Sequence, residues 1–499
     1  MRGDAVHRRI IFAVICGAFL FIIFAKGLQS AQPEVSGEEI YGWAKAQTEF
    51  GPRRPGTDGI SRSREHIIGL LKAWGYEVST EAISFTQYYP REWRLELVRP
   101  EQRIVSCYPL WHSGSTGPEG VEADLVYIHK GGARSFAKKD VAGKVVLASR
   151  GHRFINLLPT GSFYHSYELS QEKQAAGYLS FFTNTPDNAY QMIDVGSAAN
   201  KSGLAFNTLP GLSIGKEDAV YLRRLLAKDA VRVRMYLQGD SRQTETYTII
   251  ALLPGRTSEL IMVDTHYCST FTGAVDNATG VASALALARY FSLKPARERE
   301  KDLLFVFYGS HEFVDCNLGA ELLYRNHPEL ASKILLDIGL DHMAAYPWKE
   351  YFGHMTRIHP LTPLPGMDQP RGVFISETPV LYETVIPSLL NYRLVPSFVF
   401  PMALFNTGKS SSQKNPSQAE AAMSEKDSLL AYCACETAVS YEKGIAALRM
   451  LQCPLWWHTP MDTMDKFSPE QLKRVVDAHI LILEKLDRIP ADQFRKNTP

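Results

Sequence analysis

Four short stretches of this 499-residue chain carry side chains that commonly bind metal ions. In the longest, LIMVDTHYCSTFTGAVDNATG, an apolar run ends in a histidine, and an aspartate stands at the start of a probable helix. The candidate ligands are His266, Asp276, Glu312, Asp341 and His458. Imidazole and carboxylate groups bind zinc and similar ions, and catalytic metal sites keep one position open for water. These residue types indicate metal-assisted hydrolysis if the fold brings them together.

The number of candidates matches a site for two metal ions. Such a site needs one carboxylate shared between ions about 3.5–4 Å apart, with one histidine and one further carboxylate completing each ion. The three carboxylates and two histidines meet this requirement. Two ions bound in this way polarise a carbonyl group and lower the pKa of a bound water.

The segments around the candidates predict an α/β fold. The apolar runs at 260–266, 302–310 and 334–343 have the pattern of strands buried on both faces, and a helix is expected at 278–291 between the first two. This order predicts a mostly parallel central sheet flanked by helices. Ligands bind beyond the carboxyl ends of such strands, which is where most of the candidates fall.

The rest of the chain adds helices and an insertion. Two helical patterns lie before the strand that starts near residue 76, and a capping signature at 468–471 begins a last helix. From 96 to 244 the pattern changes to short apolar runs and Gly-rich turns, which we interpret as an inserted β-rich domain. We therefore expect 31–95 and 245–495 to form the main domain around this insertion.

The first 30 residues have the features of a signal peptide or an N-terminal membrane anchor. Three arginines precede an uncharged, mostly apolar run from Ile10 to Ala25, and three glutamates follow it. A basic start and an acidic flank predict that the body of the protein is exported. It would be membrane-anchored outside the cytoplasm if the leader stays, and secreted or periplasmic if the leader is cleaved.

Composition is that of an ordinary globular protein. Hydrophobic residues make up 45% and charged residues 21%, and the formal net charge is +1. This charge gives no reason to expect a nucleic acid partner. The seven cysteines are odd in number and form no redox or zinc-ribbon spacing, so buried free thiols are favoured over one or two disulfides. Nothing in the sequence indicates an oligomeric state.

The order of these motifs resembles metallopeptidase family M28, a group of zinc aminopeptidases and carboxypeptidases. The matching metal-site motifs are THY, GAVDNATGVASALALARYF, FYGSHE, IGLDHM and HTPMDTMDKF. FGPRRPGT is similar to the family's opening loop, and DVAGKVVLASRG and LPGLSIG are similar to segments of a protease-associated (PA) domain. The resemblance implies a zinc-peptidase fold with a PA-like domain inserted at 96–244.

Carried over residue by residue, the resemblance implies two zinc ions. His266 and Asp341 would bind one ion, Glu312 and His458 the other, and Asp276 would bridge them. Asp337, on the same predicted strand as Asp341, is the competing candidate, although the family's register matches Asp341 better.

Two positions depart from the family's pattern. Where the family has a Glu-Glu pair whose first member is the general base, this chain has His311 before Glu312. Where an aspartate usually steers the first imidazole ligand, this chain has Cys268, a weaker acceptor. An imidazole with an ordinary pKa near 6.5 can accept a proton from water at neutral pH. We therefore expect His311 to be the base, with metal binding or no role as the alternatives. Cys268 would either support His266 or only fill space beside it.

The expected function is zinc-dependent hydrolysis of a peptide or amide substrate by an aminopeptidase-like exopeptidase. The two departures keep a second reading open, a catalytically altered metal-binding ectodomain with a binding role. A third is a single-zinc acyltransferase similar to glutaminyl cyclases.

Overall fold

The computed structural model describes residues 35–494 except 130–132, 151, 154–157, 160–164, 184, 186–187, 196–206, 315, 348–367, 405–426 and 453. The expected leader at 1–30 lies outside the described residues. Across the described ranges, no helix combines the length and the apolar character needed to cross a membrane. Residues 33–499 group as one compact unit.

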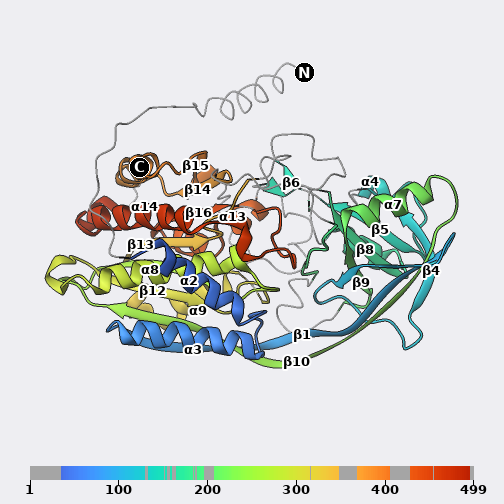
Figure 1. The fold of residues 1–499 in the computed structure, drawn as a ribbon, viewed down its shortest axis with the longest axis horizontal. Helices are drawn as coiled ribbons and strands as arrows, with labels where there is room; N and C mark the ends of the chain where they lie inside the picture. The colour runs from blue at the N-terminus through green and yellow to red at the C-terminus, as the bar shows by residue number, and fades with distance from the viewer. Residues whose placement is uncertain are drawn as a thin grey trace, which may run out of the picture. The chain divides into compact units, whose positions relative to one another are not determined.

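A mostly parallel sheet forms the centre of the fold, as predicted (Figure 1). Parallel pairing joins β12 (Asp302–Tyr308), β11 (Leu260–His266), β13 (Ile334–Asp341) and β16 (Ala446–Gln452) in that order. Beyond β16, β14 (Arg371–Ile375) is antiparallel to it and parallel to β15 (Ser397–Pro401). Every residue of β11 and β16 is buried, which explains their continuous apolar runs.

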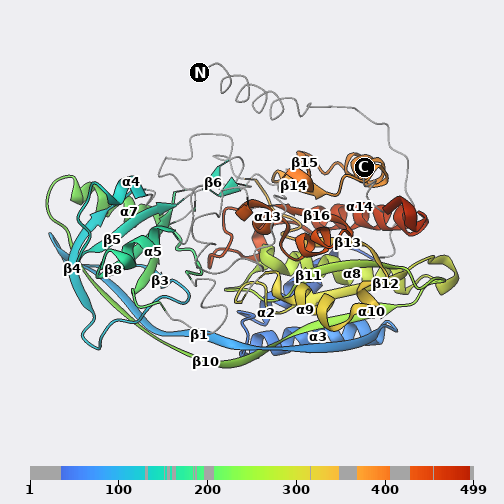
Figure 2. The ribbon, with the colours of Figure 1, turned by 180° about the vertical axis from the view of Figure 1, so that it is seen from behind.

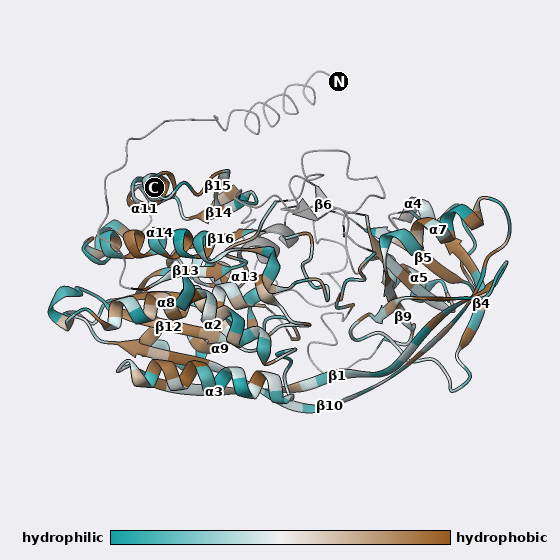
Figure 3. Cartoon of the chain, viewed as in Figure 1, coloured by the Kyte–Doolittle hydropathy of each residue, from teal (hydrophilic) through white to brown (hydrophobic). Residues whose placement is uncertain are grey.

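Helices cover both faces of this sheet, because alternate residues of each strand pack into different cores. Phe305 and Phe307 of β12 pack in one core, and Leu304 and Val306 pack in the other. The first core includes α2 (Gly37–Glu49), α3 (Asp58–Ala73), α8 (Gly280–Ser292), α11 (Pro379–Asn391) and α14 (Pro469–Asp487). The second includes α9 (Leu318–Asn326), α10 (Pro328–Ala331) and α13 (Asp427–Glu442), which Figure 2 shows from behind. Figure 3 shows the apolar character of β12.

Local signals in the sequence set the ends of two of these helices. Ser468 accepts a hydrogen bond from the backbone N–H of Gln471, whose side chain accepts one from the Ser468 N–H in return. This is the capping box predicted for α14. Gly75 follows α3 with φ +86°, a left-handed conformation that glycine adopts without a steric penalty.

Two long strands connect this sheet to the inserted segment. β1 (Glu77–Arg99) pairs antiparallel with β10 (Arg232–Leu253) along almost its whole length. The single strand β10 covers most of two apolar runs, at 231–237 and 246–255, that a polar stretch separates in the sequence. The domain borders expected at 95/96 and 244/245 therefore fall inside continuous strands.

The inserted segment contains a second set of parallel strands. β4 (Val121–Tyr127), β5 (Val145–Arg150), β8 (Gly177–Phe182) and β9 (Gly211–Ile214) pair in parallel, and β3 (Cys107–Pro109) adds antiparallel to β9. β4 also pairs with β10, so one sheet order runs from β15 to β3. The helices α4 (Ala133–Phe136), α5 (His165–Glu172) and α7 (Lys216–Leu226) make this segment more helical than the expected β-rich domain. Two short strands, β6 (His152–Arg153) and β7 (Leu158–Pro159), pair separately, and β2 (Arg103–Val105) pairs with β1.

The cysteines whose side chains are described carry no disulfide. Cys107, Cys268, Cys316 and Cys435 are free thiols. Cys107, Cys268 and Cys435 are buried, as expected, whereas Cys316 is partly exposed.

Candidate metal centre

The five predicted ligands meet in one buried cluster at the carboxyl ends of the strands. His266 and Asp341 end β11 and β13, and Glu312 follows β12. Asp276 lies in the turn before α8, and His458 lies in the loop after β16. Each of these five side chains is at most 10% exposed.

Asp276 stands between the other candidates, with one oxygen on each side. Its Oδ1 is 3.5 Å from Nε2 of His266, and its Oδ2 is 3.3 Å from Nε2 of His458. Nε2 of His266 is also 3.2 Å from Oδ1 of Asp341, and Nε2 of His458 is 2.7 Å from Oε2 of Glu312. These contacts bring together the side chains that the resemblance implies as two pairs and a shared carboxylate.

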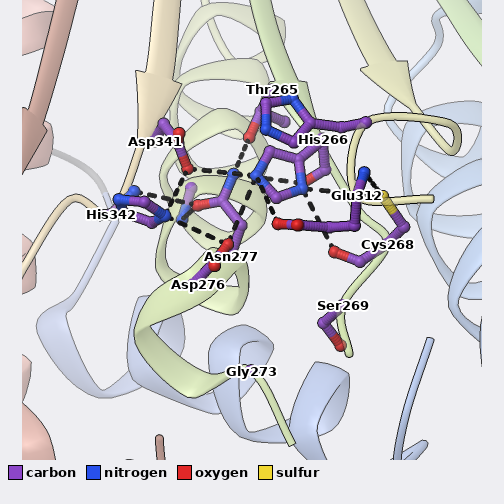
Figure 4. Close-up of polar contacts among 12 residues, drawn as sticks. Thr265, His266, Cys268, Ser269, Gly273, Asp276, Asn277, Glu312, Asp341 and His342 are labelled. Atoms are coloured by element: carbon purple, nitrogen blue, oxygen red, sulfur yellow. Dashed lines mark hydrogen bonds and ion pairs between the residues drawn. The ribbon is translucent and has the colours of Figure 1, made fainter. Parts of the chain in front are cut away.

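A third histidine, which the sequence analysis missed, faces the same cluster. Nε2 of His342 is 3.2 Å from Oδ1 of Asp276 and 3.3 Å from Oδ1 of Asp341. Figure 4 shows His266 and His342 approaching these aspartates from opposite sides. His342 and His458 both have positive φ values, +48° and +56°, which are uncommon for residues other than glycine and concentrate at functional sites.

All three histidines present the same nitrogen to the cluster. Nδ1 of His266 lies 3.2 Å from the carbonyl oxygen of Cys268, Nδ1 of His342 lies 2.8 Å from that of Gln452, and Nδ1 of His458 lies 3.3 Å from that of Met192. A carbonyl oxygen only accepts, so each Nδ1 carries the proton. The lone pair of each Nε2 is therefore directed into the cluster, as in histidines that bind metals.

Several atoms of the cluster lack hydrogen bonds, which tests whether a metal fits. Oδ1 of Asp276 and Nε2 of His342 and His458 are buried and form no hydrogen bond within the described part of the chain. Imidazole and carboxylate atoms at 3.2–3.3 Å that miss hydrogen-bonding geometry are expected where their lone pairs point at a common cation. The donor set of imidazoles and carboxylates suits zinc.

The structure places Asp341, and not Asp337, in the cluster. Asp337 is fully buried elsewhere on β13, and its carboxylate accepts a hydrogen bond from the hydroxyl of Ser440. Burial, the larger effect, raises the pKa of Asp337 to about 7 against the Ser440 hydrogen bond, which lowers it. The register that favoured Asp341 agrees with this geometry.

His311 belongs to a second charged network beside the cluster. Its Nδ1 is 2.7 Å from Oε1 of Glu436, and its ring stacks on that of His266 with centroids 3.9 Å apart. The other oxygen of Glu436 is 3.3 Å from the guanidinium of Arg449, which also donates to Oδ2 of Asp341 at 2.7 Å. Arg449 therefore links the partner of His311 to a predicted metal ligand.

Cys268 supports the first histidine in a different way from the one expected. The acceptor that faces Nδ1 of His266 is the backbone carbonyl of Cys268, and the thiol lies farther away, at 3.8 Å. The thiol instead accepts from the backbone N–H of Glu312 at 3.4 Å. Burial raises the pKa of Cys268 well above its usual value, so the group is a neutral thiol.

Two buried residues outside the predicted set position the loop that carries Asp276. Arg53, from FGPRRPGT, donates to the carbonyls of Tyr267 at 2.8 Å and Gly273 at 3.0 Å. Asp462, from the final motif, accepts from the backbone N–H groups of Val275 at 2.8 Å and Asp276 at 2.9 Å. Both motifs were recognised in the sequence, but these two roles were not.

Electrostatics in the cluster follow from the pairing of histidines with carboxylates. Burial alone would raise the pKa of Asp276, but His342 and His458 outweigh it and hold that pKa well below 3.8. Burial would lower the pKa of both histidines, but their carboxylate neighbours raise it to about 9 for His342 and about 10 for His458. A cation bound among these groups would replace the protons as the balancing positive charge.

Comparison with known proteins finds a family match for part of the chain. Residues 248–362 match the model of peptidase family M28, a range that includes β11, β12 and β13 and four of the five predicted ligands. This segment of the chain resembles the M28 aminopeptidase-like family. The M28 match supports a peptidase.

The curated relatives share only part of their length with this chain. An aminopeptidase of Pseudomonas aeruginosa is 24% identical over 298 residues, which make up 52% of this chain and 48% of the relative. The chain thus spans about half the length of the curated relatives it matches.

Solved structures share the fold over almost the whole chain. The M28 peptidase precursor from Shewanella amazonensis has a TM-score of 0.66 at 17% identity, covering 97% of this chain and 98% of that one. A zinc aminopeptidase from Bacillus subtilis has a TM-score of 0.63 at 16% identity, covering 94% and 100%. An aminopeptidase from Aneurinibacillus sp. strain AM-1 has a TM-score of 0.59 at 19% identity, covering 90% and 93%. These similarities confirm the predicted α/β fold.

Proposed function

We propose that this chain is a zinc-dependent, aminopeptidase-like exopeptidase that binds two metal ions and acts outside the cytoplasmic membrane. The observation that carries the proposal is the convergence of three histidines and three carboxylates, with unpartnered lone pairs, in one buried cluster. His266 and Asp341 would bind one ion, Glu312 and His458 the other, and Asp276 both. The location rests on the charge pattern of the first 39 residues.

When bound, the ions supply Lewis-acid chemistry at the scissile carbonyl and on the attacking water. The chain's own residues hold the metal ligands in position. Arg53 and Asp462 fix the backbone around Asp276, and Arg449 takes one oxygen of Asp341 so that the other faces the cluster. Burial of these groups keeps bulk water away and strengthens their electrostatic interactions.

His311 is proposed as the group that accepts a proton from water and returns it to the leaving amine. Because Nδ1 donates to Glu436, the Nε2 lone pair is free to accept a proton. Burial would lower the pKa of His311, but Glu436 outweighs it and raises that pKa well above 6.5. Cations bound next to Glu312 would oppose this rise. Glu436 thus orients the imidazole and stabilises the imidazolium that forms during turnover.

Metal content and turnover of the purified protein test the proposal together. We expect two zinc ions per chain and hydrolysis of aminoacyl p-nitroanilides and dipeptides, with no cleavage of the N-acetylated substrates. His311→Ala should lower kcat by about 100-fold or more with unchanged metal content. His311→Glu, which restores the family's carboxylate, should retain activity. His327→Ala, a change at a partly exposed histidine of α9's C-terminal end, is the matched control.

Other outcomes would replace the proposal. Bound metal without hydrolysis of any of these substrates, by either the unmodified protein or His311→Glu, would indicate a metal-binding protein with a binding role. One metal ion and cyclisation of an N-terminal glutamine would indicate an acyltransferase.

A further inference from the structure

The two halves of the metal centre offer unequal numbers of side chains. Around Oδ2 of Asp276 stand Glu312 and His458, which gives three protein ligands. Around Oδ1 stand His266, Asp341 and His342, which gives four. One ligand atom from each of these four lies within 4.8 Å of the others.

Separations within the group of four match those around a single tetrahedral zinc. Nε2 of His266 lies 3.5 Å from Oδ1 of Asp276 and 3.2 Å from Oδ1 of Asp341. Nε2 of His342 lies 3.2 Å and 3.3 Å from the same two oxygens. Ligand atoms about 2.0–2.1 Å from one zinc ion at tetrahedral angles are about 3.3 Å apart. Four atoms at these spacings leave room for one small cation among them.

The neighbours of His342 hold its imidazole toward the space among these four ligand atoms. Nδ1 donates to the carbonyl of Gln452 at 2.8 Å, and the backbone N–H donates to Oδ1 of Asn277 at 3.2 Å. The side chain is buried, and its Nε2 forms no hydrogen bond with any residue that the structure describes. A left-handed backbone at φ +48° turns His342 so that it and its neighbour Asp341 both face Asp276. These features are those of a metal ligand with its supporting hydrogen bond.

We propose that His342 is a fourth protein ligand of the first metal ion, together with His266, Asp341 and the shared Asp276. This closes the first site in the manner of a structural zinc site, while the second site, with three protein ligands, keeps the open position of a catalytic one. The inference rests on the metal binding proposed above. It predicts one tightly bound ion and one exchangeable ion in each chain.

Chelator titration of the metal-loaded protein tests whether the two metal ions bind with different affinities. Release of zinc from the unmodified protein to a chromophoric chelator should occur in two separate steps of one ion each. His342→Gln should weaken the tighter step by about 100-fold or more, which is at or above the upper end of the loss seen for supporting residues. His327→Gln, at a histidine outside the cluster, should leave both steps unchanged. Equal release curves for the unmodified protein and His342→Gln would overturn the assignment.

Spectroscopy on the unmodified chain covers the case in which His342→Gln does not fold. Protein loaded with one equivalent of cobalt should show the intense visible bands of tetrahedral coordination. Zinc X-ray absorption of the one-metal form should show two imidazole ligands. One imidazole, or weak cobalt bands of higher coordination, would refute the closed site while leaving the proposed peptidase in place. Absence of any bound metal would refute both.

Discussion

At the scale of single residues, Glu436 connects the proposed base to the metal centre. Its two oxygens face His311 and Arg449, and both the carboxylate and the guanidinium are almost completely buried. Burial would raise the pKa of Glu436, but His311 and Arg449 lower it, so the group is ionised. A buried charge held by two partners can orient an imidazole without touching substrate. Glu436 is therefore a positioning residue.

Replacing Glu436 by glutamine should lower kcat about 10–100-fold while KM and zinc content stay unchanged. The amide keeps the size of the side chain but removes the charge that orients His311 and stabilises its protonated form. Steady-state kinetics measures kcat and KM separately, and metal analysis measures the zinc content. Glu442→Gln, the same change at an exposed position of α13, is the control. A rise in KM or a loss of zinc with unchanged kcat would contradict this role.

Backbone geometry explains which site residues could be predicted from the sequence. Four of the five predicted ligands stand at or just after strand ends or at the start of a helix, where the periodicity of a parallel sheet brings them to one edge. His342 could not be predicted in this way, because neighbours on a strand point to opposite faces. Only its positive φ turns it toward the cluster. Arg449 was hidden in an apolar strand, and Glu436 is 124 residues from Glu312 in sequence.

At the scale of elements, α14 has a buried histidine on the face that packs in the core. His479 is 1% exposed, its Nδ1 donates to the carbonyl of Val475 at 2.8 Å, and its Nε2 forms no hydrogen bond among the described residues. Burial lowers the pKa of His479 to about 4, with the nearby Arg371 adding to the effect and the Val475 carbonyl opposing it. The imidazole is therefore neutral in the folded protein.

Stability should fall as the pH decreases from about 6.5 to about 4, in part because of His479. In this window the unfolded chain binds a proton at this position and the folded chain does not, so acid favours unfolding. The lowering of this pKa from 6.5 to about 4 corresponds to at most about 3.4 kcal/mol of folding stability, which is fully present above pH 6.5. His479→Leu should remove this part of the pH dependence of the free energy of unfolding, as measured by denaturant unfolding at several pH values. If the free energy of unfolding depends on pH equally in the variant and the unmodified protein, His479 does not titrate in this way. His327→Gln is the surface control.

Elements with local signals were predictable, and those set by distant pairing were not. The capping box of α14 and the glycine after α3 lie within a few residues of the ends they define. The continuity of β10 depends instead on β1, which pairs with it from Glu77↔Leu252 to Arg99↔Arg232. The sequence between its two apolar parts is polar, QGDSRQTE, and without the partner strand it has the pattern of a turn.

At the scale of the whole molecule, hydrogen bonds join the inserted segment to the loop of the metal centre that carries His458. The backbone N–H of Met192 donates to the carbonyl of His458 at 2.8 Å, and the side chain of Gln191 donates to the carbonyl of Trp457 at 2.6 Å. Nδ1 of His458 faces the carbonyl of Met192. The insertion therefore contributes directly to the orientation of one predicted ligand.

Metal removal should lower stability and loosen this connection more than the rest of the insertion. Without cations, the carboxylates of Asp276, Glu312 and Asp341 lie close together, and their charge is balanced by the histidines, Arg449 and Arg53. Bound zinc at 1,000 times its Kd would stabilise the fold by about 4 kcal/mol per site. Hydrogen exchange after chelation should increase at Met192 and in the loops before α8 and after β16, and zinc should reverse it. Strands β4 and β5, which pair away from the centre, should keep their protection. Uniform loss of protection across the insertion would mean that the metal centre controls global stability, and unchanged exchange at Met192 would mean that the insertion does not respond to the metal.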